Sequence, residues 1–297
     1  MPNQFDLITK YSANVLDEIF KKASVTAILE GNSNLYNFVN AKTVMIPDVV
    51  LSQLGAYDRE NGYSKGNIQV NYTPYTLTQD RGTAFEWDEM DAEETVVAQY
   101  PVIQRLFVEE QSTPQVDAYR LSKLRASADP VGIVTETVAA NKIITRFNDA
   151  IKYFEDNEVG LNGAFFISTE INKQLKETTE LARKITQMDF KNASGITFTV
   201  PAYENIPIIV VPPKRFKTEY DFTATGYNEK VGATDINFML VNFMSALPIA
   251  KHRKVRYFNP TENQGKNAHK FDYRLYHDII VPANKQKGIY VSEKAGA

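Results

Sequence analysis

The sequence predicts an α+β fold built from a long hairpin, a long helix and a separate α/β unit. Over residues 75–125, strand-like alternation gives way to apolar residues spaced by three and four, which indicates a strand followed by a helix. Residues 49–81 have two extended limbs around a glycine-bearing turn. From residue 135 onward, short strands alternate with helices, which is typical of a compact α/β unit.

The composition excludes several classes of protein. The chain of 297 residues has no cysteine, which excludes disulfides, thiolate metal sites and cysteine nucleophiles. Its longest apolar runs are far too short to cross a membrane as a helix. A net charge of −3 argues against binding nucleic acid through the whole surface. With 43% hydrophobic residues, the chain can fill a sizeable core.

The first 42 residues are expected to form an N-terminal arm. Residues 5–20 carry an apolar stripe typical of an amphipathic helix, and Gly-Asn-Ser-Asn at residues 31–34 interrupts the pattern. A terminal helix followed by an irregular segment is weakly held unless another surface binds it. Another subunit is one such surface.

A long hairpin is predicted next. The polar stretch at residues 55–67 contains the turn sites Asn61-Gly62 and Lys65-Gly66. If residues 49–81 form one hairpin, each limb of about 15 residues reaches ~50 Å, whereas a compact chain of this length has a radius of gyration of about 19 Å. An isolated two-stranded ribbon is marginal in water, so a projecting hairpin would need a neighbouring subunit. Length alone equally allows a hairpin that folds back on its own sheet.

A long helical stretch follows. We expect a helix from about Glu93 to Gln111, with Pro101 kinking it or beginning a second segment, because proline removes a helical hydrogen bond. A second helix is expected from Pro114 to about Ser127. Asp129-Pro-Val-Gly132 then marks a domain boundary.

The α/β unit is expected to begin with a helix over residues 137–157. A buried strand at residues 164–168 follows, and Ser168 is expected to cap the next helix. Further strands are predicted at residues 196–200, 206–211, 236–241, 254–260 and 270–281, with a polar loop at 220–233 and a closing strand at 287–291.

Six carboxylates crowd into residues 86–94. Hard cations bind several oxygens, so a metal-dependent hydrolase that uses this cluster is one hypothesis. The spacing matches no calcium loop, however, and acidic residues at a helix start also favour the helix macrodipole. We therefore interpret the cluster as structural or inter-subunit. Its members are Glu86, Asp88, Glu89, Asp91, Glu93 and Glu94.

The remaining candidate sites are weaker. The three histidines, His252, His269 and His277, lack metal-ligand spacing, and nucleophile-elbow, Walker and dinucleotide motifs are absent. His277 and Asp278 are neighbours on an expected strand and should face opposite sides. The basic run 251–254 with Arg256 is interpreted as a solvated or inter-subunit patch. The sequence therefore predicts no enzyme, catalytic residue, cofactor or metal.

Three passages carry a distinctive pattern: DRGTAFEWDEMDAEE at residues 80–94, PQVDAYRLSKL at 114–124, and KFDYRLYHD at 270–278 followed by NKQKGIYV at 284–291. In order and spacing they resemble the major capsid proteins of tailed bacteriophages, from about Thr43 to the end of the chain. The resemblance implies the Hong Kong 97-type fold. The implied parts are an N-terminal arm at 1–42, a peripheral domain at 43–132 and 246–297 with closing strands, an axial domain at 133–245, an extended loop at 55–81 and a spine helix at 93–127.

The resemblance also implies a function. The chain would form pentamers and hexamers that close into an icosahedral shell around double-stranded DNA, assembled in the host bacterial cytoplasm and present in the virion. The expected partners are further copies, a portal, decoration proteins, and DNA bound without sequence specificity, with no membrane. Because the chain enters its arm soon after Met1, we expect the scaffolding protein to be separate. An encapsulin-type compartment, which shares the fold and encloses cargo enzymes, is the alternative.

Contacts between subunits are expected in the hairpin, the carboxylate cluster and the basic run. The candidate residues are Tyr57, Arg59, Tyr63, Lys65, Arg81, Glu86, Asp88, Glu89, Asp91, Lys251 and Arg253. Some members of the family join subunits through a lysine–asparagine crosslink. Lys65 lies in the hairpin, and we interpret it as a solvated charge.

Overall fold

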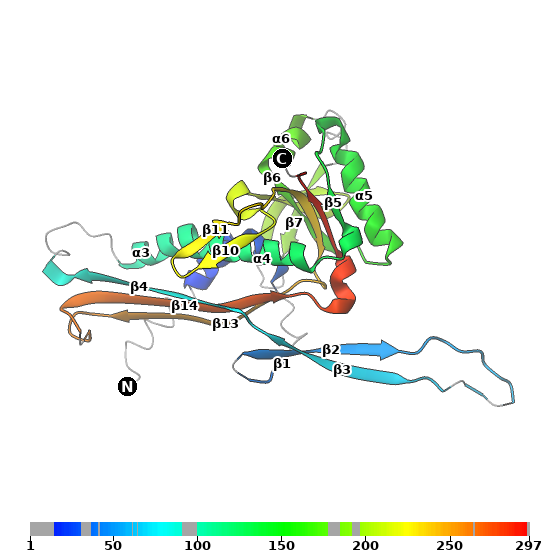
Figure 1. Cartoon of the computed structure of the whole chain (residues 1–297), viewed down its shortest axis with the longest axis horizontal. Helices are drawn as coiled ribbons and strands as arrows, with labels where there is room; N and C mark the ends of the chain where they lie inside the picture. The colour runs from blue at the N-terminus through cyan, green and yellow to red at the C-terminus, as the bar shows by residue number, and fades with distance from the viewer. Residues whose placement is uncertain are drawn as a thin grey trace. The chain divides into compact units, whose positions relative to one another are not determined.

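The computed structural model describes residues 15–30, 37–40, 42–60, 62–63, 65–90, 100–177, 185–191, 197–263 and 265–295 (Figure 1). The chain forms two compact units, one of residues 32–78 and one of residues 1–31 with 79–297. Both helices and sheets are present, as the α+β prediction requires. In the described residues, no helix is long and apolar enough to cross a membrane.

The smaller unit is built on a hairpin. β2 (Thr43–Leu51) and β3 (Ile68–Thr76) pair antiparallel along their whole length, and the short β1 (Asn37–Phe38) lies on the other side of β2. Beyond the strands, the backbones of Asp58 and Gly62 exchange two hydrogen bonds. Gly62 has a φ of +81°, a conformation that side-chain-bearing residues rarely adopt.

The predicted hairpin is therefore present, with different limits. Its C-terminal limb ends at Thr76 and not at Arg81, because β4 (Gln79–Asp88) belongs to another sheet. The N-terminal limb begins at Thr43, which makes the paired limbs nine residues each.

The larger unit contains a seven-stranded sheet. Its strands, in spatial order, are β5 (Ile133–Thr135), β15 (Ile289–Glu293), β12 (Ile236–Asn242), β6 (Gly163–Ser168), β9 (Ile206–Val211), β8 (Thr197–Tyr203) and β7 (Ile185–Lys191). β15 thus lies beside β12. The domain limits predicted from the sequence stay predictions.

Two cores cover the two faces of this sheet. Alternate residues of β6 point to opposite faces, so Phe165 packs with one core and Phe166 with the other. α5 (Ile143–Asp156) and α6 (Thr169–Glu177) cover the first face. Ser168 Oγ accepts a hydrogen bond from the backbone N of Ile171 at 3.2 Å, which confirms the predicted cap.

A continuous helix packs into the second core. It consists of α3 (Tyr100–Phe107), the π-helical turn η3 (Val108–Ser112) and α4 (Thr113–Ser127), here called the spine helix. The predicted break before Pro114 is wrong, because the π turn accommodates this proline. Thr113 donates its backbone N–H to Val108 O, five residues back, and its Oγ1 donates to the same oxygen at 2.7 Å. The start predicted at Glu93 lies outside the described residues.

A second sheet of three antiparallel strands lies along the spine helix (Figure 1). Its order is β13 (Leu247–Phe258), β14 (Ala268–Ile280) and β4. One face packs on the spine helix and on the helical residues 15–23, in a third core that includes Phe20, Phe271 and Tyr273. The other face carries mostly polar residues.

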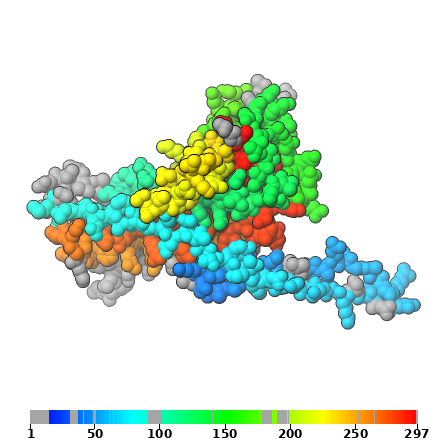
Figure 2. All heavy atoms as spheres, in the orientation of Figure 1, coloured from blue at the N-terminus to red at the C-terminus, as the bar shows by residue number. Residues whose placement is uncertain are grey.

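The prediction of a polar loop at residues 220–233 is wrong for residues 220–229. β10 (Tyr220–Thr223) and β11 (Gly226–Glu229) form a hairpin, drawn in yellow on the molecular surface in Figure 2. The ring of Phe222 stacks near Tyr227 and meets Tyr119 of the spine helix edge-on, with centroids 5.4 Å apart. The alternation of Tyr220 and Phe222 was the strand signal, masked by the polar residues around it.

Candidate assembly surfaces

The hairpin carries a row of exposed apolar side chains. Each of the following is at least 46% exposed: Leu51, Leu54, Tyr57, Tyr63, Ile68, Val70 and Tyr72. At the hairpin tip, defined here as residues 52–67, the rings of Tyr57 and Tyr63 meet edge-on at 5.0 Å. Arg59 and Lys65 are exposed beside them. Several large exposed apolar side chains on one segment are typical of a contact with another molecule.

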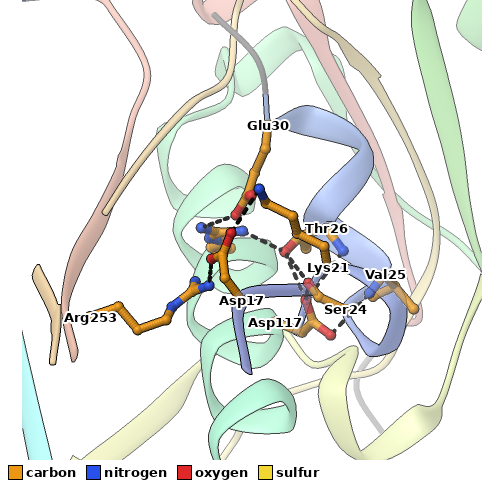
Figure 3. A network of polar contacts seen from close by, with 9 residues as sticks. Asp17, Lys21, Ser24, Val25, Thr26, Glu30, Asp117 and Arg253 are labelled. Atoms are coloured by element: carbon orange, nitrogen blue, oxygen red, sulfur yellow. Dashed lines mark hydrogen bonds and ion pairs between the residues drawn. The ribbon is translucent and has the colours of Figure 1, made fainter. Parts of the chain in front are cut away.

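A buried polar network joins residues 15–30 to the spine helix (Figure 3). The fully buried carboxylate of Asp117 accepts hydrogen bonds from the hydroxyls of Ser24 (2.6 Å) and Thr26 (2.7 Å) and from the backbone N of Val25 and Thr26 (3.2 Å each). Arg215 forms an ion pair with the same carboxylate at 3.2 Å. Asp117 therefore fixes the start of the 3₁₀ turn η1 (Val25–Leu29) to α4.

Two arginines complete this network. The buried Arg120 donates to Thr26 Oγ1 (3.1 Å) and to Glu30 Oε1 (2.9 Å). Arg253 of β13 forms an ion pair with Asp17, and its guanidinium lies 4.2 Å from the ring centroid of Phe20. The side chain of Arg253 is only 11% exposed. The residue predicted to contact another subunit thus makes its contacts within its own chain.

Arg81 also points inward. It donates to the carbonyl of Gly226 at 2.9 Å, and so joins β4 to the β10–β11 hairpin. It lines a cavity of about 920 Å³ between β4, the spine helix and this hairpin, together with Phe85, Phe107 and Tyr227. The inter-subunit role predicted for Arg81 stays a prediction.

His277 lies on the wall of the same cavity and is nearly fully buried. Its Nδ1 has no hydrogen-bond partner among the described residues. Burial, together with the charges of Arg120, Arg253 and Arg81, lowers the pKa of His277 to about 3. The neighbouring Asp278 accepts a hydrogen bond from the Tyr119 hydroxyl at 2.7 Å. The ring therefore stays neutral at physiological pH, as befits a structural histidine.

His277 should make the fold sensitive to acid. The ordinary histidine pKa of 6.5 applies in the unfolded chain, so below that pH the unfolded state binds more protons than the folded state and stability falls. Between pH 7 and pH 5 we expect His277 to account for a loss of about 2 kcal/mol in the free energy of unfolding. Urea unfolding of the wild type and of His277→Phe at both pH values measures this. His269→Gln, on the same strand, is the control, and equal pH dependence in all three proteins would contradict the assignment.

The carboxylate cluster forms no metal centre among the described residues. Glu86 pairs with Lys270 at 3.5 Å, and Asp88 accepts a hydrogen bond from the backbone N of Met90 at 3.0 Å. Within the part of the chain that the structure describes, no three His, Asp or Glu side chains are grouped to hold a metal ion. Asp91, Glu93 and Glu94 lie outside the described residues.

Comparison with known proteins identifies the fold. No family model matches the sequence, and no curated protein matches it. The capsid structure of cyanophage P-SCSP1u matches with a TM-score of 0.62 at 13% identity, over 88% of this chain and 86% of that chain. The mature capsid of bacteriophage PhiM1 matches with a TM-score of 0.60 at 9% identity, over 86% and 82%. This chain has a phage capsid fold.

The same capsid fold occurs in a compartment protein. The SrpI encapsulin of Synechococcus elongatus matches with a TM-score of 0.54 at 11% identity, over 88% of this chain and 84% of that chain. The fold predicted from the resemblance is thus confirmed, and it is common to both kinds of shell.

Within this capsid fold, sequence reasoning missed two sets of residues. It did not find Asp117, whose partners lie more than 90 positions away in the chain. It also treated the basic run as one patch, although the structure turns Arg253 inward and leaves Lys254 and Arg256 exposed. The period-2 alternation of a strand, with Val255 buried between them, was the available signal.

Proposed function

We propose that this chain is the major capsid protein of a tailed phage, and that it assembles into pentamers and hexamers that close an icosahedral shell around double-stranded DNA. The observation that carries the proposal is the exposed apolar hairpin on a chain with a phage capsid fold. Beyond the short β1, which pairs only with Val44 and Met45, the hairpin has two strands and gains little stability from them in water. It gains stability when its apolar side chains are covered by another copy.

In the proposed assembly mechanism, a shell is held together by many copies of one contact between subunits. Burying one large apolar side chain contributes about 1.5–3 kcal/mol, and the row contains seven such side chains. Much of that gain is offset by the loss of rotational and translational freedom on association. Each contact is therefore modest, and the stability of the shell comes from repeating it around a closed assembly.

The remaining partners follow from the same proposal. The net charge of −3 is compatible with enclosing DNA without adhering to it tightly. A separate scaffolding protein, a portal and decoration proteins would act with the shell, which would be assembled in the host cytoplasm and end in the virion. Tyr57, Tyr63, Arg59 and Lys65 are the hairpin residues that we place at the contact between subunits.

Electron microscopy of the purified full-length chain tests the proposal. We expect closed shells, or rings of five and six subunits, both for the chain alone and for the chain co-expressed with its scaffolding protein. A chain that stays monomeric under both conditions would refute the proposal. The contents of native particles separate the two kinds of shell, because a phage capsid holds double-stranded DNA and an encapsulin holds a cargo enzyme.

A further inference from the structure

The sheet of β13, β14 and β4 has an outer face, the face turned away from the third core, on which side chains are arranged in rows. Residues directly opposite each other in an antiparallel pair lie on the same face. Lys254 of β13 lies opposite Arg274 of β14, which lies opposite Gly82 of β4. In the same way, Arg256 lies opposite Asp272, which lies opposite Ala84. The face can therefore be followed row by row from one edge of the sheet to the other.

Charge on this face changes sign from edge to edge. The β4 edge carries Asp80, Glu86 and Asp88, followed by Glu89. The β13 edge carries Lys254 and Arg256, and the central strand mixes both signs through Lys270, Asp272 and Arg274. In Figure 2, the cyan atoms of β4 and the orange atoms of the C-terminal strands form adjoining bands of the surface.

The central strand neutralises only part of this charge. Arg274 binds Asp80 at 2.8 Å, and Lys270 binds Glu86 at 3.5 Å. Four charged residues remain without an ion pair to any residue that the structure describes. They are Asp88 and Glu89 at the acidic edge and Lys254 and Arg256 at the basic edge, and all except the half-buried Glu89 are exposed.

We propose that the acidic β4 edge of one copy binds the basic β13 edge of the next copy, through Asp88 and Glu89 on one side and Lys254 and Arg256 on the other. The occupant of each edge is thus a second copy of this chain. This inference rests on the proposed function, and it names the surface through which copies recognise one another in addition to the hairpin.

Symmetry decides the kind of contact. A two-fold contact made edge to edge would pair each edge with the same edge of the other copy, which here would join acid to acid or base to base. Among edge-to-edge contacts, a head-to-tail contact joins opposite charges, and repeating it forms a ring when the rotation between copies closes. Both β13 and β4 are edge strands of this sheet, so neither has a further described strand on its outer side.

A simpler explanation of these charges is that they protect the two edges of the sheet from pairing with other strands. Charged side chains on edge strands prevent unwanted strand pairing, and they do so with either sign. That role does not require acids on one edge and bases on the other. The segregation by sign therefore favours recognition.

The register of the contact also follows from the strand pairing. Arg256 is level with Ala84, and Asp88 lies four residues farther along β4. The same displacement brings Lys254, which is level with Gly82, to Glu86, two residues before Asp88. At about 3.3 Å per residue, this is a displacement of ~13 Å along the strands. Neighbouring copies should therefore be stepped along the strand direction by about this distance.

Charge reversal tests the proposal on the full-length chain. Asp88→Lys with Glu89→Lys, or Lys254→Glu with Arg256→Glu, should each reduce the yield of shells about ten-fold or more, because each places like charges at the contact. The variant that combines all four reversals exchanges the signs of the residues that make the proposed contact. It should recover shells to within about two-fold of the wild type, because head-to-tail complementarity is restored.

Matched controls change the net charge by the same amount elsewhere. Glu155→Lys with Asp156→Lys on α5, and Lys285→Glu with Lys287→Glu before β15, should assemble as the wild type does. Circular dichroism checks that every variant is folded. Light scattering and electron microscopy then measure the shells.

Three outcomes would overturn the inference. They are normal shells from both two-residue edge variants, failure of the combined variant to recover although it is folded, or equal losses in the controls. A wild type that never forms shells would instead refute the proposed function, so the two failures are distinguishable.

Discussion

Deleting residues 56–66 is expected to give a folded, soluble chain that forms no closed shells. Tyr57 and Tyr63 would be lost from the apolar row, while the paired strands β2 and β3 would remain. The described residues of this segment are exposed or half-buried and belong to none of the three cores. The deletion should therefore change the thermal unfolding midpoint by only a few degrees, about 2–4 °C or less. Electron microscopy would measure the loss of particles.

Point variants sharpen this test. Tyr57→Ser with Tyr63→Ser keeps the length of the hairpin tip and removes both exposed rings, so we expect shell formation to weaken strongly. Lys152→Ser is the control, because this lysine is exposed on α5 and lies outside the hairpin. Normal particles from the deletion would show that the hairpin tip has no role in assembly.

Replacing Asp117 by alanine is expected to destabilise the fold by about 3–5 kcal/mol. The carboxylate is fully buried, and its removal leaves the donors of Ser24, Val25 and Thr26 without their acceptor. It also leaves the charge of Arg215 unpaired at that position. Each buried donor that loses its partner costs about 1–3 kcal/mol. Urea unfolding at pH 7 measures the total.

Two further variants separate the possible causes. Glu109→Ala removes an exposed ion pair with Arg105 on the same spine helix, and should cost less than about 1 kcal/mol. Asp117→Asn keeps an acceptor oxygen and should lie between the wild type and Asp117→Ala. If residues 15–30 are held mainly by this network, limited proteolysis of Asp117→Ala should cut there first. Equal stability of the Asp117→Ala and Glu109→Ala variants would contradict this account.

The sequence by itself determined the regular elements that bury one face. The strands at 163–168, 206–211 and 236–242 lie where apolar periodicity placed them. The helix predicted at residues 137–157 is present as α5 but begins only at residue 143, after the 3₁₀ turn at 140–142. The cap at Ser168 and the hairpin with its turn at Gly62 could also be predicted from the sequence. These features depend on residues a few positions apart, and such patterns are visible in one dimension.

Only the tertiary structure decided which residues far apart in the sequence contact one another. The π turn lets Pro114 remain within a helix although proline predicts its end, and Tyr119 gives the aromatic face of the β10–β11 hairpin a surface to pack on. The division of charge between the β4 and β13 edges exists only because β14 pairs with both strands. Asp117 meets Ser24 across 93 positions, and no local pattern marks it. Burial and strand pairing bring such residues together, because they minimise exposed apolar surface and unpaired polar groups over the whole chain at once.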